Sequence, residues 1–175
     1  MRKRVSVFLA IVFAIASLGL APAYAVDERV IDVVAVTWNG AATALSNPKT
    51  IGGVIDTEVN ANWKKFTTMV GATTDRTISF KTGKVLETPI TLPSKMACTG
   101  SAASDFMTSI RSEAYRRLGV ANSFNRYLVV YSPKAGCVWS GRAGLGGPKS
   151  VSGTLVMHDS DSSFVIAHEL GHTFG

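Results

Sequence analysis

Charge is scarce in this chain of 175 residues, since only 17% of them are Asp, Glu, Lys or Arg. Hydrophobic residues make up 46%, and this composition excludes a chain kept disordered by its charge. The formal net charge is +6, but no acidic residue precedes Asp27, and three of the 18 basic residues lie at positions 2–4. Without those three, 15 basic residues face 12 acidic ones, and a net charge of +3 gives no reason to expect a nucleic-acid partner.

Long apolar runs are also rare. Only Val5–Leu20 approaches the length of a membrane-spanning helix. It follows the basic segment Arg2–Arg4 and precedes Ala23-Tyr24-Ala25, which has the small-x-small form of a signal cleavage site. We therefore expect residues 1–25 to be a secretory signal peptide, and residues 26–175 to be exported without stable membrane association. An uncleaved membrane anchor is the alternative.

Cysteine is limited to Cys98 and Cys137, which lie 39 positions apart. The oxidising environment of an exported protein favours a disulfide bond between them. Two buried free thiols, or one cysteine bound to a metal ion, are the alternatives. A disulfide closing a loop of this length would stabilise the fold by about 2–4 kcal/mol in the chain-entropy model.

Several segments have the composition of β-strands. The first is nearly continuous in β-branched and apolar residues, as is typical of a strand buried on both faces in a parallel sheet. One later segment contains Pro89, which favours the edge of a sheet. The expected strands are Arg29–Trp38, Thr77–Lys81, Lys84–Leu92, Arg126–Tyr131 and Leu155–Met157.

Helical periodicity separates these strands. Apolar residues at steps of three and four predict a helix over about Ile51–Val70. A second helix is expected from Ser104, as its N-cap, to Gly119, and a third opens near Asp161 or Ser162. Residues 136–153, with six glycines, indicate a loop or hairpin. The order predicts one domain of mixed α/β class, a twisted sheet with packed helices and a C-terminal helix.

The residues that carry chemistry lie in this last helix, in the segment His168-Glu169-Leu170-Gly171-His172. Histidines four positions apart project from the same face of a helix, one turn apart. Two such imidazoles can bind one Zn²⁺ at about 2.0–2.1 Å each. Glu169 is rotated away from both, so we expect it to act as a general base toward the attacking water. His158 is expected to be an ordinary polar residue at a strand end, with an outer-shell or auxiliary metal residue as the alternative.

The segment His168–Gly175 reads H-E-L-G-H-T-F-G and matches the first eight positions of the metzincin motif H-E-x-x-H-x-x-G-x-x-H. The chain therefore resembles the metzincin zinc peptidases, most closely the gametolysin-type secreted proteases. The resemblance implies zinc ligation by His168 and His172, catalysis by Glu169, and a sharp turn at Gly175. It also implies the fold of the upper subdomain of a metzincin catalytic domain.

The resemblance places a third zinc ligand three positions beyond Gly175, where the given sequence ends. That ligand is histidine in most of the family and aspartate in snapalysin-like relatives. We expect residues 26–175 to correspond to the catalytic domain truncated after its zinc-binding helix. Such a chain would bind zinc weakly and show little or no peptidase activity by itself.

The function expected from these residues is that of a secreted zinc-dependent endopeptidase, acting as a monomer on protein or peptide substrates. Two other functions stay open. One is a secreted non-catalytic binding domain with a relic or structural zinc site, and the other is zinc-dependent hydrolysis of a non-peptide substrate. Residues beyond Gly175 would distinguish the catalytic from the relic site.

Overall fold

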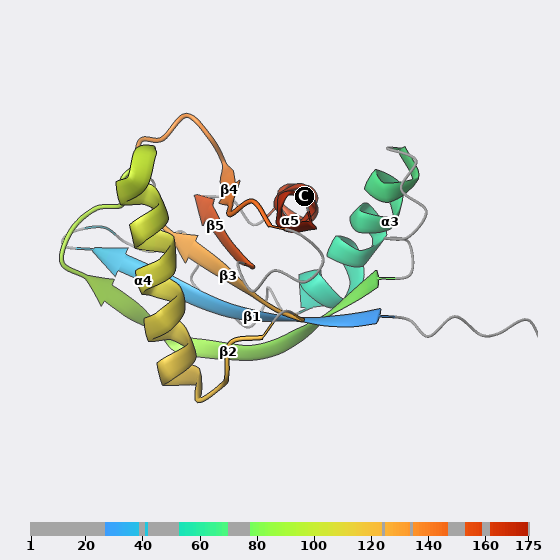
Figure 1. The fold of residues 1–175 in the computed structure, drawn as a ribbon, viewed down its shortest axis with the longest axis horizontal. Coiled ribbons are helices and arrows are strands. Elements are labelled where there is room, and N and C mark those ends of the chain that lie inside the picture. The colour runs from blue at the N-terminus through green and yellow to red at the C-terminus, as the bar shows by residue number, and fades with distance from the viewer. Residues whose placement is uncertain are drawn as a thin grey trace, which may run out of the picture.

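The computed structural model describes residues 27–38, 41, 53–69, 78–123, 125–133, 135–146, 153–158 and 162–174, with the side chain of His158 left out. The predicted signal peptide, most of the predicted loop over residues 39–49 and Gly175 lie outside these ranges. Within them the chain forms a mixed α/β fold of one five-stranded sheet, three α-helices and a π-helical turn (Figure 1). The predicted fold class is thus confirmed.

The sheet has the strand order β2-β1-β3-β5-β4. The pairs β1·β2, β1·β3 and β3·β5 are parallel, whereas β4 runs antiparallel to β5 at one edge of the sheet. Four of the strands were expected from the sequence. The two expected strands on either side of Gly83 form one continuous strand in the structure. The strands are β1 (Asp27–Trp38), β2 (Ile78–Leu92), β3 (Arg126–Ser132), β4 (Gly141–Ala143) and β5 (Thr154–His158).

The outer strand β2 carries the irregularity that Pro89 requires. Val34 pairs with Leu86 and Val36 with Ile90, so three residues of β2 oppose one residue of β1. Pro89 lies in this bulge, where its missing N–H interrupts no regular ladder. The expectation of an edge strand is confirmed, because β2 is the outermost strand on its side of the sheet.

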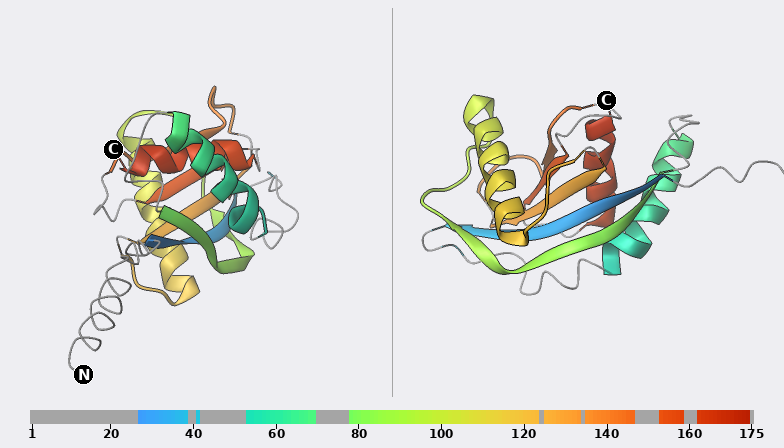
Figure 2. Two further views of the ribbon diagram at one scale, coloured as in Figure 1. Left: turned by 90° about the vertical axis from the view of Figure 1, so that its right-hand side faces the viewer. Right: turned by 60° about the horizontal axis from the view of Figure 1, so that its bottom comes forward.

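Helices cover both faces of the sheet, and the alternation of side chains divides the core in two. On one face, Ile31, Val33 and Ala35 of β1 pack with the helices α3 (Asn60–Met69) and α5 (Ser163–Phe174). On the other face, Val34 and Val36 pack with α4 (Gly100–Leu118). The left panel of Figure 2 shows α3 and α5 in front of the sheet and α4 behind it. This arrangement explains why β1 contains the uninterrupted apolar run Val33–Val36.

Two helices differ in detail from the sequence prediction. The first expected helix begins with a π-helical turn, η1 (Ile55–Val59), before α3. The Asn60 side chain donates to the carbonyl oxygens of Ile55 (3.3 Å) and of Phe80 in β2 (2.7 Å) and accepts from the Phe80 N–H (2.8 Å). A side chain that bonds both the widened turn and the neighbouring strand gives a local reason for this irregularity.

The second helix, α4, begins at Gly100 with Thr99 at its N-cap, so the predicted start at Ser104 is wrong. The helix has one more turn at its N-terminus than predicted. Ala103 in this turn is buried, and its packing favours a helix that begins before Ser104. The end of the helix is as predicted. Gly119 adopts the left-handed conformation (φ 61°, ψ 44°) at the C-terminus, where glycine lacks the Cβ that disfavours it.

One charged group lies in the centre of the sheet. Asp32 of β1 is fully buried, and both of its carboxylate oxygens accept hydrogen bonds from Arg126 of β3, at 2.6 and 2.7 Å. The Lys84 backbone N–H of β2 donates to the same carboxylate at 2.7 Å. Gly83 passes so close that a Cβ there would lie 2.4 Å from Asp32 Oδ1. The buried carboxylate therefore joins three neighbouring strands.

The disulfide bond between Cys98 and Cys137 is present, with the two Cα atoms 5.3 Å apart. It joins the segment before α4 to the segment before β4. The Cys98 carbonyl oxygen also accepts hydrogen bonds from the Trp139 indole (3.1 Å) and the Arg142 guanidinium (3.2 Å). The bond and its neighbours thus fix the start of the edge strand β4.

Removing this bond is expected to destabilise the protein. The double variant Cys98→Ser/Cys137→Ser should lose about 2–4 kcal/mol in the free energy of unfolding, because the unfolded chain regains the freedom of a 39-residue loop. Urea unfolding of the two proteins measures this difference. An unchanged midpoint and slope would show that the bond does not contribute to stability.

Candidate metal centre

The helix α5 holds the motif residues. Its start is as predicted, since Ser162 precedes the first turn and its hydroxyl accepts a weak bond from the Val165 N–H (3.4 Å). Ile166, Leu170 and Phe174 recur at steps of four and are buried in the core shared with α3 and the sheet. This apolar stripe, together with the buried Ala167, fixes the rotation of the helix against the core.

His168 and His172 lie on the exposed side of α5, one turn apart. Their ring centroids are 4.9 Å apart, and the ring planes are nearly perpendicular, at 87°. The Phe66 ring of α3 lies edge-on to His168, with the centroids 6.2 Å apart. The two imidazoles are therefore neighbours that are accessible from solvent.

Glu169 has a different environment, because only 6% of its surface is exposed. It lies against β4, where a Cβ built on Gly141 would be 2.7 Å from its Cγ and 2.8 Å from its Oε1. Burial raises the pKa of the carboxyl above its ordinary value, whereas the nearby His172 and His168 and a hydrogen bond from the Ala143 backbone act in the opposite direction. The carboxylate is thus held in place by the edge strand.

A shallow hollow joins Glu169 and His172 to the edge strand. It has a volume of about 250 Å³, and its wall includes Trp139, Arg142 and Leu145. The Gly146 N–H donates to the His172 carbonyl oxygen at 3.2 Å, which holds the segment after β4 against the end of α5. Strand and helix thus form the two sides of one depression.

The described residues supply two of the ligands that one zinc ion needs. Neutral imidazoles are preferred zinc ligands, and His168 and His172 are adjacent, accessible and on one face of a helix. In the part of the chain that the structure describes, no group of three or more His, Cys, Asp or Glu side chains is gathered for a metal ion. The described residues therefore offer two ligands and an adjacent carboxylate.

The structure places His168 and His172 side by side on α5 and Glu169 on the neighbouring, buried side of the same helix. Sequence reasoning missed Gly141 and Ala143, which contact Glu169 from a strand of only three residues. A strand this short has no readable alternation, and glycine in it gives no sign that a carboxylate lies opposite. The side chain of His158, for which an outer-shell or auxiliary metal role was the alternative, lies outside the described residues.

The close approach at Gly141 makes a specific prediction. In Gly141→Ala the new methyl group would overlap the Glu169 side chain, so the carboxylate or β4 must move. A misplacement of about 1 Å can reduce turnover about 100-fold. We expect a loss of 10- to 100-fold in any hydrolytic activity of this site, measured on an unfolded protein substrate.

The matched control for this variant is Gly53→Ala, because a Cβ at Gly53 has no neighbour within 4 Å. Its activity should equal that of the unmodified protein. Equal activities of both alanine variants would contradict the role of Gly141 in positioning Glu169.

No family model matches the chain, and no curated protein is significantly similar to it. Among the described residues, no helix has both the length and the apolar character needed to cross a membrane.

Proposed function

We propose that this protein is a secreted zinc-dependent endopeptidase of the metzincin type. The observation that carries the proposal is the division of roles within one helix. His168 and His172 are exposed and adjacent, whereas Glu169 is buried against an edge strand. A structural zinc site needs a closed ligand set, but a hydrolytic site needs an accessible ion beside a fixed carboxylate.

The residues of the chain divide the chemistry between them. His168 and His172 would hold Zn²⁺ through their ring nitrogens. When bound, the ion supplies Lewis-acid polarisation of the scissile carbonyl and makes water more acidic. A carboxylate oxygen of Glu169 accepts the proton of the attacking water and returns it to the leaving amine. Contact with β4 keeps this carboxylate from rotating into solvent.

The edge strand supports a peptide substrate in particular. Among the described strands, β4 pairs only with β5, which leaves its other side available to an extended chain. A peptide that adds to this edge gains backbone hydrogen bonds whatever its sequence. It would then lie beside the hollow that contains Glu169 and His172. A small non-peptide substrate would make no use of the strand.

The test is hydrolysis of an unfolded protein by the protein expressed from its complete gene. We expect the activity to disappear after treatment with a chelator and to return when zinc is added. Zinc binding without hydrolysis would favour the non-catalytic binding domain. Hydrolysis that survives removal of all metal would overturn the zinc-dependent mechanism.

Secretion makes a separate prediction. The mature protein should begin at Val26, because Ala23-Tyr24-Ala25 has the form of a signal cleavage site. The intact mass of protein recovered from the culture medium measures this directly. Retention of residues 1–25 on the exported protein would contradict it.

A further inference from the structure

The packing of α3 against α5 gives the candidate ligand His168 an aromatic neighbour. The two helices lie side by side on one face of the sheet (Figure 2). The ring centroid of Phe66 in α3 is 6.2 Å from that of His168, and the ring planes meet at 70°. Edge-on pairs at this separation are a favoured arrangement of aromatic rings.

Phe66 is itself held in place by the core. It packs against the core shared by α3 and α5, and its ring centroid is 6.4 Å from that of Trp63 in the preceding turn of α3. Only 2% of Trp63 is exposed, so the residue on which Phe66 rests is fixed. The Phe66 ring therefore has little freedom to move away from His168.

Glycine at position 171 lets this ring come close to α5. A Cβ on Gly171 would lie 3.1 Å from Phe66 Cε1 and 3.5 Å from its Cζ. The first distance is shorter than the usual contact of about 3.5–4.0 Å between two carbon atoms. Position 171 lies three residues after His168 and one before His172. The close approach thus occurs in the turn of α5 that separates the two histidines.

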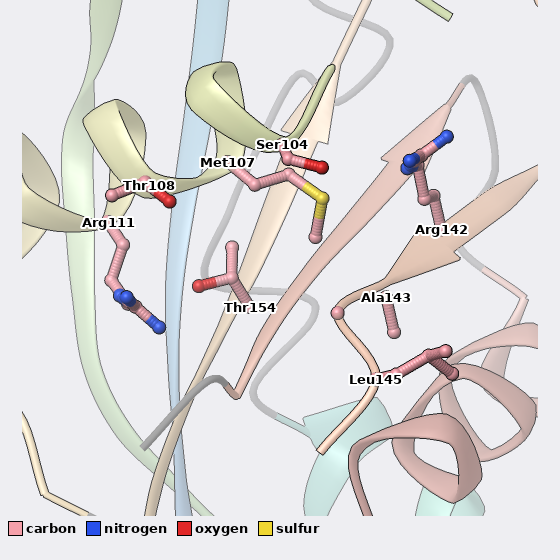
Figure 3. Close-up of a pocket in the computed structure, with 9 residues that line it drawn as sticks. Ser104, Met107, Thr108, Arg111, Arg142, Ala143, Leu145 and Thr154 are labelled. Atoms are coloured by element: carbon pink, nitrogen blue, oxygen red, sulfur yellow. The ribbon is translucent and has the colours of Figure 1, made fainter. Parts of the chain in front are cut away.

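The surroundings of the three site residues differ. The hollow of about 250 Å³ beside β4 is lined by Glu169 and His172 but not by His168. A larger cavity of about 410 Å³, between α4, β4 and the start of β5, is lined by none of the three (Figure 3). The edge strand and the segment after it thus lie beside Glu169 and His172, whereas α3 provides the neighbour of His168.

The two imidazoles already have the separation that one shared ion requires. Ring nitrogens bound at about 2.0–2.1 Å to one tetrahedral zinc ion place the two ring centres about 5 Å apart. The centroids of His168 and His172 are 4.9 Å apart. A side chain that is kept in its binding conformation beforehand loses less freedom when the ion binds.

We propose that Phe66 is a positioning residue for the zinc ligand His168 and keeps this imidazole beside His172. The inference rests on the proposed function, because it takes His168 to be a zinc ligand. An exposed histidine on a helix would otherwise exchange between staggered rotamers. Only some of these rotamers direct the ring toward His172, so a neighbour that restricts them reduces the entropy lost on zinc binding.

Replacement of Phe66 by leucine tests this role in the protein expressed from its complete gene. Leucine keeps an apolar side chain against the core but removes the ring beside His168. We expect the zinc affinity, measured by competition with a chromogenic chelator at neutral pH, to fall about three- to tenfold. The matched control is Phe106→Leu, because Phe106 of α4 is also partly buried but packs in the core on the opposite face of the sheet. It should keep the zinc affinity of the unmodified protein.

The conformation of the His168 side chain gives a second readout that needs no metal. In the zinc-free protein, three-bond NMR couplings about its Cα–Cβ bond should report one dominant rotamer. In Phe66→Leu these couplings should move toward averaged values, and in Phe106→Leu they should not change. Unchanged zinc affinity in Phe66→Leu, or unchanged couplings, would each overturn the proposal. An equal loss of zinc affinity in Phe106→Leu would also overturn it.

Failure of this proposal and failure of the proposed function can be told apart. Zinc-dependent hydrolysis with an unchanged zinc affinity in Phe66→Leu would overturn the positioning role alone. The expected loss of affinity in a protein that does not hydrolyse peptides would support the positioning role and overturn the endopeptidase.

Discussion

Replacing Glu169 with glutamine should abolish most peptide hydrolysis and leave zinc binding intact. The substitution keeps the shape of the side chain, which is buried against Gly141, but removes its ability to accept a proton. General base catalysis by such a group contributes about 10²–10⁴-fold, and we expect a loss in that range in the protein expressed from its complete gene. Turnover of a fluorogenic peptide and zinc content after dialysis are the two measurements.

A variant that lacks a zinc ligand should behave differently from Glu169→Gln. His168→Ala should lose zinc and activity together, because the site then lacks one of the protein ligands that a catalytic zinc ion needs. Glu169→Gln should separate the two properties. Full proteolysis by Glu169→Gln, or loss of zinc from it, would show that Glu169 does not have the role of a proton acceptor beside the metal.

Substitution of Arg126 by methionine should destabilise the protein by about 3–5 kcal/mol. Arg126 donates to both carboxylate oxygens of Asp32, whose side chain is fully buried, while 23% of the Arg126 side chain is exposed. Without the guanidinium, the buried carboxylate loses its opposite charge and keeps the hydrogen bond from the Lys84 backbone N–H at 2.7 Å. Urea unfolding with the disulfide intact measures the loss.

Two further variants test whether the unpaired buried charge causes the loss of stability in Arg126→Met. Arg116→Met breaks an exposed pair with Glu113 on α4, and it should cost no more than about 1 kcal/mol. Asp32→Leu/Arg126→Met removes both charges and should recover part of the stability lost in the single variant, because no unpaired charge remains. A single variant as stable as the Arg116→Met control would contradict the structural role of the buried pair.

Much of the fold could be predicted from the sequence, because its strongest elements have one dominant signal. The apolar run of β1 required a strand buried on both faces, and the sheet places it between β2 and β3. Gly119 ended α4 as predicted, since the left-handed conformation at that position favours glycine. Two cysteines in a chain with a signal-like segment predicted the disulfide that the structure contains.

Other features depended on tertiary contacts that no local pattern reports. The start of α4 is set by the packing of Ala103 and not by the capping preference of Ser104. The π-helical turn depends on Asn60, whose partner Phe80 is 20 positions away. For the site, helical spacing was sufficient to place His168 and His172 on one face, but the contact between Glu169 and β4 joins residues 28 positions apart along the chain.

Zinc binding by the two histidines tests the central claim most directly. The measurement is the dissociation constant of Zn²⁺ for the unmodified protein and for His168→Ala and His172→Ala, by competition with a chromogenic chelator at neutral pH. We predict that each substitution weakens binding at least tenfold while the urea midpoint of the zinc-free protein changes little, because both side chains are exposed. Equal zinc affinity in all three proteins would contradict the assignment of His168 and His172 as the metal ligands.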